Sequence, residues 1–598
     1  MKFLFPLLVS FLLISCSQTS NKTPEDSLAS ASKSDHQLQQ LIRTYQQFYQ
    51  QSSPFNDPQE GGNNGKLPNL SAEFLAKQQL KRQNIYRALT NIDEQELNSA
   101  NQINSAVLAY FLKNQIDSYE NKEHFMPLTS ESGFHVWISN ISQQVNLKSA
   151  QDYRDYLAKL SAIPHYFAQQ ITWMNEGIKA GITQPKVVLK GFEQSITAFI
   201  KEDVTQSIYF KPLLKMSSHI SPSLQQSIKE EAKQIISDKI MPTYQQYYEF
   251  MVNRYQIHAR DNIAATSLPN GKSYYQNRVE HYTTLDITAD QVHQKGLAEV
   301  KRIRAEMNEI IKQVEFEGDF KAFINFLRND ARFYAKTPVD LLREASYIAK
   351  KMDAKLPTLF KTLPRTPYGV IEVPANIAPK YTTGRYSGPA RDDQAGNYWV
   401  NTYRLDRRPL YVLPALTLHE AVPGHHLQGS IAQEMENVPK FRNRIYISAF
   451  GEGWGLYSEY LGIEAGIYET PYQNFGRLTY EMWRACRLVV DTGMHAKGWS
   501  RKQAIDYLAD NTALSLHNVQ TEIDRYISWP GQALSYKIGE LTIKRLRKNA
   551  EQVLGEKFDL RDFHDQILKN GSMPLNMLEK VIGDYIISVK SAIEDKTE

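Results

Sequence analysis

A proline and a glycine interrupt a stretch that holds three histidines and one glutamate within eight residues. An apolar run, Tyr411–Leu418, leads into it. Pro423 removes a backbone hydrogen-bond donor and kinks a helix, and Gly424 permits a looped-out turn. The sequence therefore predicts a helix kinked by a local bulge here. The stretch reads Leu418-His419-Glu420-Ala421-Val422-Pro423-Gly424-His425-His426-Leu427.

The histidine spacing in this stretch differs from the usual zinc pattern. His-Glu-x-x-His places two histidines four residues apart on one helical face, but here the next histidines lie six and seven residues beyond His419. On an unbroken helix His426 lies about two turns, roughly 10 Å, from His419, too far to share an ion. A local bulge at the Pro423-Gly424 kink brings His425 within reach. We therefore predict His419 and His425 as metal ligands, with His426 as an alternative ligand or a contact of a ligand or substrate.

A catalytic zinc ion takes three protein ligands and keeps one position open for water. Glu420 follows His419 directly and is placed to take a proton from that water. For the third ligand we expect Glu452, which lies between two glycines where a helix begins. An acid at a helix start is also favoured by the helix dipole alone. Glu459, two turns further on, is predicted to orient a histidine.

The rest of the chain predicts a mainly α fold. From Ser71 to about 360 the pattern is helical, with capping sequences at Thr288 and Thr337. Prolines and glycines interrupt it from Leu363 onward, and two short extended runs follow, at 368–373 and 396–403. We expect a large, elongated helical body with a deep cleft and a small β-sheet next to the His-Glu helix, whose edge strand, 396–403, binds an extended peptide.

The N-terminus predicts export and lipid attachment. Lys2 precedes an apolar segment that is too short to span a membrane as a mature helix. The segment ends in Leu13-Ile14-Ser15-Cys16, which resembles a bacterial lipobox. This resemblance implies cleavage before Cys16, lipidation of its thiol and, with Ser17 rather than Asp next, an outer-membrane location facing the periplasm.

These features give a domain plan. Residues 1–15 are a signal peptide, 16–35 a flexible tether, and 36–598 a single mainly helical domain with its catalytic core at about 365–545. The formal net charge of +4 on 598 residues, without a Lys/Arg block, argues against nucleic acid as a partner. The sequence does not indicate an oligomeric state.

Four motifs together carry a resemblance to a known family. They are His-Glu-Ala-Val-Pro-Gly-His-His-Leu-Gln from 419, Gly-Glu-Gly-Trp-Gly-Leu-Tyr-Ser-Glu from 451, Asp491-Thr492-Gly493-Met494-His495-Ala496-Lys497-Gly498-Trp499, and the segment from Arg525 to Gly539. They resemble the bacterial domain-of-unknown-function family 885, which is grouped with the zincin-like metallopeptidases.

The resemblance implies a gluzincin-type peptidase, although the spacing after Glu420 is two residues longer than in that pattern. It implies His419 and Glu452 as ligands, Glu420 as the base, and Tyr536 or Tyr526 as the tyrosine that stabilises the oxyanion. Attack on an amide requires such a donor, and His495 is a further candidate. Three arginines, which often serve as ion-pair partners, are candidates to bind a substrate carboxylate: Arg484, Arg487 and Arg525.

We therefore expect a zinc-dependent peptidase of the cell envelope, carboxypeptidase- or oligopeptidase-like, with one zinc ion per chain and small peptides as substrates. Two alternatives stay open. One is a lipoprotein that binds peptides or another protein through a retired metal site. The other is a metal hydrolase that acts on a non-peptide amide.

Overall fold

A computed structural model describes residues 32–52, 65–145, 147–375, 377–389 and 393–594. The predicted signal peptide, Cys16 and the tether up to residue 31 lie outside this range. The predicted mainly α fold is confirmed, since helices form most of the described chain beside one three-stranded sheet. Within the described residues, no helix is long and apolar enough to cross a membrane.

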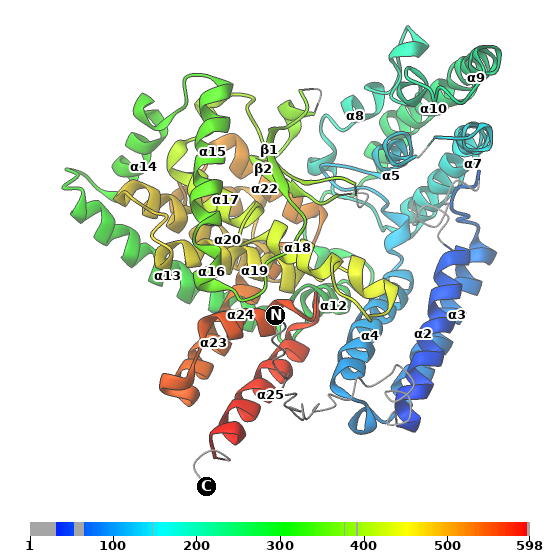
Figure 1. Cartoon of the computed structure of the whole chain (residues 1–598). Helices are drawn as coiled ribbons and strands as arrows, with labels where there is room; N and C mark the ends of the chain where they lie inside the picture. The colour runs from blue at the N-terminus through cyan, green and yellow to red at the C-terminus, as the bar shows by residue number, and fades with distance from the viewer. Residues whose placement is uncertain (1–31, 53–64, 146, 376, 390–392, 595–598) are drawn as a thin grey trace, which may run out of the picture.

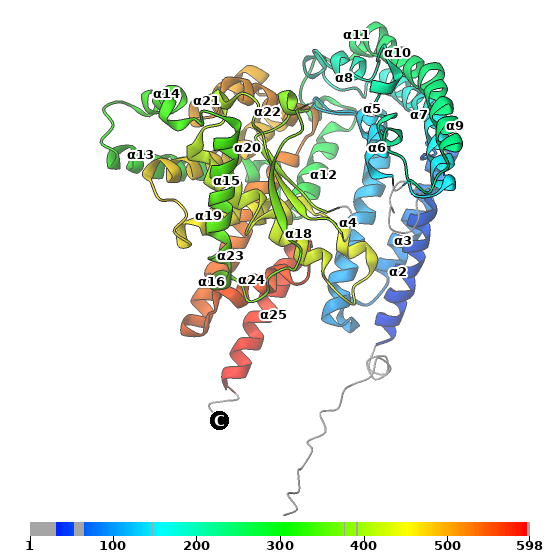
Figure 2. The same ribbon diagram turned by 45° about the horizontal axis from the view of Figure 1, so that its top comes forward.

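The first half of the chain forms an N-terminal arm of helices, residues 33–258, which stands beside the rest of the molecule in both views (Figures 1 and 2). Its first three helices enclose a small apolar core of their own around Leu38, Ile42 and Leu108. The main helices of the arm are α2 (Lys33–Ser52), α3 (Ala72–Thr90), α4 (Ser99–Glu120), α7 (Ala150–Ala180), α9 (Pro222–Ile235) and α10 (Met241–Phe250).

The second half forms the C-terminal lobe, residues 271–594, whose core is continuous with that of α7–α10. Its main helices are α12 (Gly271–Thr283), α13 (Ala289–Gln313), α15 (Pro338–Asp353), α17 (Leu413–Glu420), α18 (His425–Gln433), α19 (Ser448–Glu464), α20 (Pro471–Ala496), α22 (Leu516–Ser528), α23 (Ser535–Leu554), α24 (Leu560–Leu568) and α25 (Leu575–Glu594). Helix α20 is buried along most of its length, so residues of its inner turns are held rigidly.

The predicted helix starts are confirmed where the sequence carried a capping signal. The side chain of Ser71 accepts a hydrogen bond from the backbone N–H of Phe74. Thr288 and Thr337 each form a full capping box with the residue three positions on. Such caps satisfy backbone donors that the first turn of a helix leaves unpaired.

Helices α19 and α23 approach each other through two glycines. A Cβ atom added to Gly453 would lie 2.5 Å from the Cα of Gly539, and one added to Gly539 would lie 2.0 Å from the carbonyl oxygen of Ala449. Both positions therefore require glycine. The contact joins the helix that carries Glu452 to the one that carries Tyr536.

The sheet differs from the prediction in which strand forms its edge. Strand β3 (Gly396–Val400) lies in the centre, parallel to β1 (Tyr368–Glu372) and antiparallel to β2 (Gly384–Ser387). The expectation of an edge strand at 396–403 was therefore wrong. Strand β2, which contains a glycine and only four residues, gave no recognisable strand signal. The sheet packs one face on α17, where Gly384 meets Leu416 and the Tyr398 hydroxyl lies 3.3 Å from that of Thr417.

Polar contacts join the arm to the lobe. The backbone N–H of Ser130 in the arm donates to the hydroxyl of Ser528 at the end of α22, over 3.0 Å. Arg278 of α12 forms an ion pair of 2.7 Å with Glu123. These contacts place the arm segment around Ser130 beside the end of α22.

Candidate metal centre

The helix that begins at Leu413 ends at Glu420, and a new helix, α18, begins at His425. The Val422–Pro423 peptide bond between them is cis. The carbonyl oxygen of Pro423 accepts a hydrogen bond of 2.8 Å from the indole N–H of Trp454 on α19. The chain therefore departs from the helix where the sequence predicts a kink, and it does so by a full break between two helices. The buried Trp454 of α19 holds this break in place.

Gly424 allows this break to be tight. A Cβ atom added to Gly424 would lie 1.9 Å from the carbonyl oxygen of His419, far inside any allowed contact. Only glycine lets the chain pass so close to the end of α17. This close approach brings the first residue of α18, His425, next to His419.

His419, His425 and Glu452 lie together, with one potential ligand atom of each within 4.8 Å of the others. The Nε2 atoms of His419 and His425 lie 3.5 and 3.4 Å from the same carboxylate oxygen of Glu452. The two imidazole rings meet edge to face, with their centroids 4.8 Å apart. The histidines come from the two sides of the break and the glutamate from the second turn of α19.

This donor set fits a divalent zinc-type ion. Two imidazoles and one carboxylate leave a position open for water, as catalytic zinc sites do. Ligand atoms about 2.1 Å from an ion at tetrahedral angles lie about 3.4 Å apart, which matches the two N···O separations. His425 and Glu452 also keep 15% and 14% of their side-chain surface exposed, so solvent reaches the group.

Glu459 orients His419 from the far side. Its Oε1 atom lies 2.8 Å from Nδ1 of His419, which leaves Nε2 pointing at Glu452. A carboxylate on the second nitrogen of a histidine fixes the ring and makes it a better ligand. Gly455 leaves room for this ring, because a Cβ atom there would lie 2.7 Å from its Cε1 atom.

The histidines and glutamates of the group shift one another's pKa. Burial alone would lower the pKa of His419, but its hydrogen bonds to Glu452 and Glu459 outweigh burial and raise the pKa to about 10. Burial would raise the pKa of Glu452, yet the two histidines hold it well below its usual range. Glu452 is therefore ionised at neutral pH and available to a cation.

Glu420, the predicted base, is held by strand β2. Its Oε2 atom accepts a hydrogen bond of 2.7 Å from the backbone N–H of Tyr386. The side chain is 9% exposed. One carboxylate oxygen is thereby fixed by the sheet, and the other can face a substrate or a water molecule.

His426 points away from the other two histidines. Its Nδ1 atom lies 3.0 Å from the hydroxyl of Tyr386, and its ring lies against Tyr368 with centroids 4.5 Å apart. Burial lowers its pKa to about 4. The break therefore places His425 rather than His426 in the group, and His426 fastens α18 to the sheet.

Two tyrosines flank the group. The ring of Tyr536, at the start of α23, stacks at 6.4 Å from the ring of His419, and the guanidinium of Arg487 lies 4.2 Å from the ring centre of Tyr536. Tyr446, which precedes α19, lies with its ring 6.2 Å from that of His425 and is 50% exposed. Both rings lie against predicted ligands.

His495 and Tyr526 have structural roles in place of the predicted catalytic ones. Nδ1 of His495 accepts a hydrogen bond from the backbone N–H of Ala265, and Nε2 lies 3.0 Å from the carbonyl oxygen of Tyr526. Both ring nitrogens are therefore engaged in the core. The buried Tyr526 hydroxyl bonds to Glu522 and Arg487 at 2.7 Å each, so it does not face a substrate.

The three predicted substrate arginines differ in their surroundings. Arg484 is buried, with its guanidinium 3.6 Å from Glu459. Arg487 is buried too, and pairs with Glu522 at 3.1 Å. Arg484 therefore contacts the group through Glu459, and Arg487 contacts it through the ring of Tyr536. Arg525 also pairs with Glu522, at 3.3 Å, but keeps 13% of its side chain exposed.

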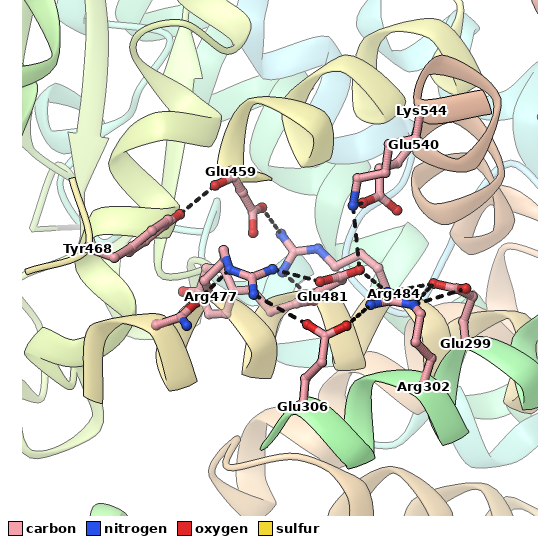
Figure 3. Close-up of polar contacts among 12 residues, drawn as sticks. Glu299, Arg302, Glu306, Glu459, Tyr468, Arg477, Glu481, Arg484, Glu540 and Lys544 are labelled. Carbon is pink, nitrogen blue, oxygen red and sulfur yellow. Dashed lines mark hydrogen bonds and ion pairs between the residues drawn. The ribbon is translucent and has the colours of Figure 1, made fainter. Parts of the chain in front are cut away.

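A buried network of charges lies behind the group, between α13, α19, α20 and α23 (Figure 3). Glu481 of α20 is its centre and pairs with Arg477 at 2.8 Å and with Arg302. Lys537, which is fully buried, contacts Glu481, Glu540 and Glu299 at 2.7, 2.6 and 2.9 Å. Since Lys537 follows Tyr536 in the chain, the network fixes the helix start that carries this tyrosine.

Four residues of this region were missed in the sequence: Tyr446, Tyr386, Arg385 and Glu131. Arg385 interacts electrostatically with Glu420, and Glu131 does so with Arg525. Tyr446 lies outside any metal motif, and its only signal is its position just before the Gly-Glu-Gly-Trp segment. Tyr386 and Arg385 lie on β2, which was not predicted as a strand. Glu131 lies more than 250 residues from the motif, and only the fold brings it near.

Comparison with known proteins gives the family and related structures. The model of the family described as "Bacterial protein of unknown function (DUF885)" matches residues 54–582. A solved "putative lipoprotein" from Colwellia psychrerythraea is 28% identical with a TM-score of 0.85, covering 93% of this chain and 100% of that one. A solved "putative lipoprotein of unknown function" from Shewanella oneidensis shares the fold, with a TM-score of 0.71 and 19% sequence identity. The match covers 92% of this chain and 100% of that one. No curated protein matches.

Proposed function

This chain belongs to the DUF885 family of bacterial proteins, whose function is unknown, and we propose that it is a zinc-dependent peptidase of the cell envelope. The observation that carries the proposal is the position of His419, His425 and Glu452, with two imidazole nitrogens 3.4 and 3.5 Å from one carboxylate oxygen. Glu420 follows the first of them in the chain. Two histidines and a glutamate as ligands, with a second glutamate as the base, are the arrangement that the resemblance to the zincin-like hydrolases implies.

His419, His425 and Glu452 would hold one zinc ion per chain. When bound, the ion acts as a Lewis acid that makes water nucleophilic near neutral pH. Glu459 keeps Nδ1 of His419 occupied, so His419 offers only its Nε2 atom as a ligand. The ligand set leaves room for water and substrate on the exposed side of His425 and Glu452.

Glu420 would carry the proton through the reaction. Its Oε2 atom is fixed by the N–H of Tyr386, which leaves Oε1 to accept a proton from the attacking water. The same carboxyl then returns that proton to the leaving amine. Hydrolysis thus adds hydroxide to the carbonyl carbon and a proton to the nitrogen of the amide.

The Tyr536 and Tyr446 hydroxyls would stabilise the oxygen that gains charge. Charge develops on the carbonyl oxygen during attack, and donors aimed at it act best on rigid elements. Tyr536 is held between Arg487 and His419, and α23 is anchored by buried Lys537. Tyr446 lies on the other side, against His425.

The N-terminal sequence and the relatives support attachment to the envelope. The lipobox-like Leu13-Ile14-Ser15-Cys16 segment would give a lipid on Cys16, and the residue at 17 favours the outer membrane. The Colwellia protein, which is described as a "putative lipoprotein", has its whole chain covered by the match. A peptidase anchored in this way would act on peptides in the periplasm.

Mass spectrometry of a peptide library tests the proposal. We expect the zinc-loaded protein to hydrolyse peptides and Glu420→Gln to reduce the rate at least about 100-fold while the metal stays bound. Glu436→Gln, on an exposed loop, is the matched control and keeps full activity. Wild-type protein that binds zinc but leaves every peptide intact would favour the peptide-binding alternative, or a non-peptide amide as substrate.

A further inference from the structure

The outer face of the sheet carries an arginine beside the candidate base. Ile371, Trp399 and Arg385 stand opposite one another on β1, β3 and β2. Their side chains therefore share a face, the one opposite buried Tyr398 and Val400. Arg385 is exposed, and its guanidinium lies 5.5 Å from the ring centre of Tyr381.

Arg385 lies close to the candidate active site but forms no ion pair there. It interacts electrostatically with Glu420, with Tyr536 and, unfavourably, with Arg525. Among the described residues, no carboxylate lies within 4.0 Å of its guanidinium. Two arginines that face the same space repel each other unless an anion joins them.

Three arginines gather around this space. Glu522 is a single carboxylate shared by Arg487, at 3.1 Å, and Arg525, at 3.3 Å. One of these two cations is therefore not neutralised by Glu522, and Arg385 adds a second. A further carboxylate approaches from the N-terminal arm: Glu131 interacts electrostatically with Arg525, Arg385 and Arg487.

Glu131 reaches this space because its segment is docked on the lobe. The neighbouring Ser130 donates its backbone N–H to the Ser528 hydroxyl at 3.0 Å, and Ser528 lies one turn after Arg525. Glu131 makes no ion pair within 4.0 Å of an arginine among the described residues. It offsets one positive charge at a distance. Of the three arginines here, Arg385 is the one without an ion pair within 4.0 Å among the described residues, so its guanidinium is available to a carboxylate.

We propose that Arg385 and Arg525 bind the C-terminal carboxylate of a peptide substrate, so that the protein removes residues from the C-terminal end of peptides. This inference rests on the proposed peptidase function. A guanidinium grips a carboxylate with two parallel hydrogen bonds, and two of them from β2 and α22 would fix the chain end beside Glu420. The peptide bond that lies next to Glu420 is then within one or two residues of the C-terminal end of the substrate.

Three peptides of otherwise identical sequence test the inference: a free acid ending in Ala, its C-terminal amide, and the amide with Glu in place of the last Ala. The zinc-loaded protein is expected to hydrolyse the free acid with a kcat/KM at least about 30-fold above that of the amide. The Glu-containing amide shows whether a carboxylate on the side chain can replace the carboxylate at the chain end. Equal rates for acid and amide, or rescue by the Glu side chain alone, would overturn the proposal.

Two variants locate the effect. Arg385→Gln is expected to bring the acid-to-amide ratio of kcat/KM close to one, mainly through KM, whereas Arg343→Gln on the exposed side of α15 keeps the wild-type ratio. Glu131→Gln removes a competing carboxylate and is expected to lower KM for the acid. An Arg385→Gln protein that keeps the full ratio contradicts the assignment.

A binding measurement separates this inference from the failure of the peptidase proposal. With the zinc-loaded Glu420→Gln protein, calorimetry is expected to give an at least about 10-fold lower Kd for the acid than for the amide. If no peptide is hydrolysed but this preference remains, the carboxylate site stands and the peptidase proposal falls. Equal binding of acid and amide overturns the carboxylate site.

Discussion

The Nδ1 atom of His419 lies 2.8 Å from the Oε1 atom of Glu459, and both side chains are almost fully buried. Glu459 is seven residues beyond Glu452 on α19, so two turns of one helix present both carboxylates to one imidazole. One carboxylate faces each ring nitrogen. This arrangement fixes the ring before any metal arrives.

Replacing Glu459 by Gln is expected to weaken metal binding about 10- to 100-fold, because the amide is a poorer acceptor for the His419 N–H. Competition with a chromophoric chelator measures the affinity. Glu464→Gln, on the same helix but paired with Arg547 at the surface, is the matched control and keeps wild-type affinity. An unchanged affinity in Glu459→Gln contradicts the role given to this residue.

The two neighbouring histidines provide a second, internal comparison. His425→Gln is expected to lose most of its bound zinc, because Nε2 of His425 faces Glu452 at 3.4 Å. His426→Gln is expected to keep one ion per chain, since His426 bonds to Tyr386 on the sheet side. Metal analysis after dialysis measures both. The reverse pattern would mean that His426 is the ligand.

The sequence predicted the interruption between the histidines, the grouping of His419, His425 and Glu452, and the contact of Glu459 with His419, because each depends on local chemistry. Pro423 and Gly424 cannot continue a helix in the ordinary way, and the spacing of Glu452 and Glu459 is fixed by the helix repeat. The capped helix starts at Thr288 and Thr337 were predictable for the same reason. Whether zinc binds stays a prediction.

Features that depend on tertiary contacts were not predictable. His495 and Tyr526 are residue types that often act in catalysis, but here their polar atoms form hydrogen bonds within the core. Only the tertiary positions of their partners, Ala265 and Glu522, show this. Strand β2 is too short to give a periodic signal, so Arg385 was missed. The predicted single domain at 36–598 and the deep cleft stay predictions.

Gly424→Ala is expected to remove metal binding and activity, because the new Cβ atom would lie 1.9 Å from the carbonyl oxygen of His419 and force the break open. Gly429→Ala in α18 is the control: its Cβ atom would meet only Tyr386 at 3.6 Å, and alanine favours the helix by about 1 kcal/mol. Zinc affinity and circular dichroism report the two effects. A Gly424→Ala protein with normal zinc affinity would show that the break tolerates a side chain.

Lys537→Met is expected to lower the free energy of unfolding by about 3–5 kcal/mol, since it leaves three carboxylates without their shared buried cation. Urea denaturation at neutral pH measures the loss. Lys580→Met, which removes an exposed pair with Asp584, is expected to cost at most about 1 kcal/mol. Similar small losses for both variants would contradict the buried role of Lys537.

His495 makes stability depend on pH. Burial lowers its pKa to about 4, below the value of about 6.5 in an unfolded chain. As pH falls from about 6.5 to 4 the unfolded chain binds the proton first, so stability is lost over this range, by up to about 3 kcal/mol from this residue. Protonation of Nδ1 would also break its hydrogen bond from Ala265.

Urea midpoints at several pH values test this dependence. His495→Gln is expected to be less stable than wild type at pH 7 but to lose less between pH 6.5 and pH 5. NMR of the histidine side chains gives a second readout, in which His495 stays neutral at pH 5. An imidazole that titrates near pH 6.5 in the folded protein contradicts its burial.

Hydrolysis measured while zinc is titrated into metal-free protein tests the central claim most directly. We predict that the rate for a susceptible peptide rises in proportion to added zinc up to one equivalent per chain and then stays constant. The Glu420→Gln protein should bind the same single equivalent and remain inactive. Hydrolysis that proceeds equally without metal, or protein that takes up one zinc ion at His419, His425 and Glu452 and cleaves no peptide, would contradict the claim.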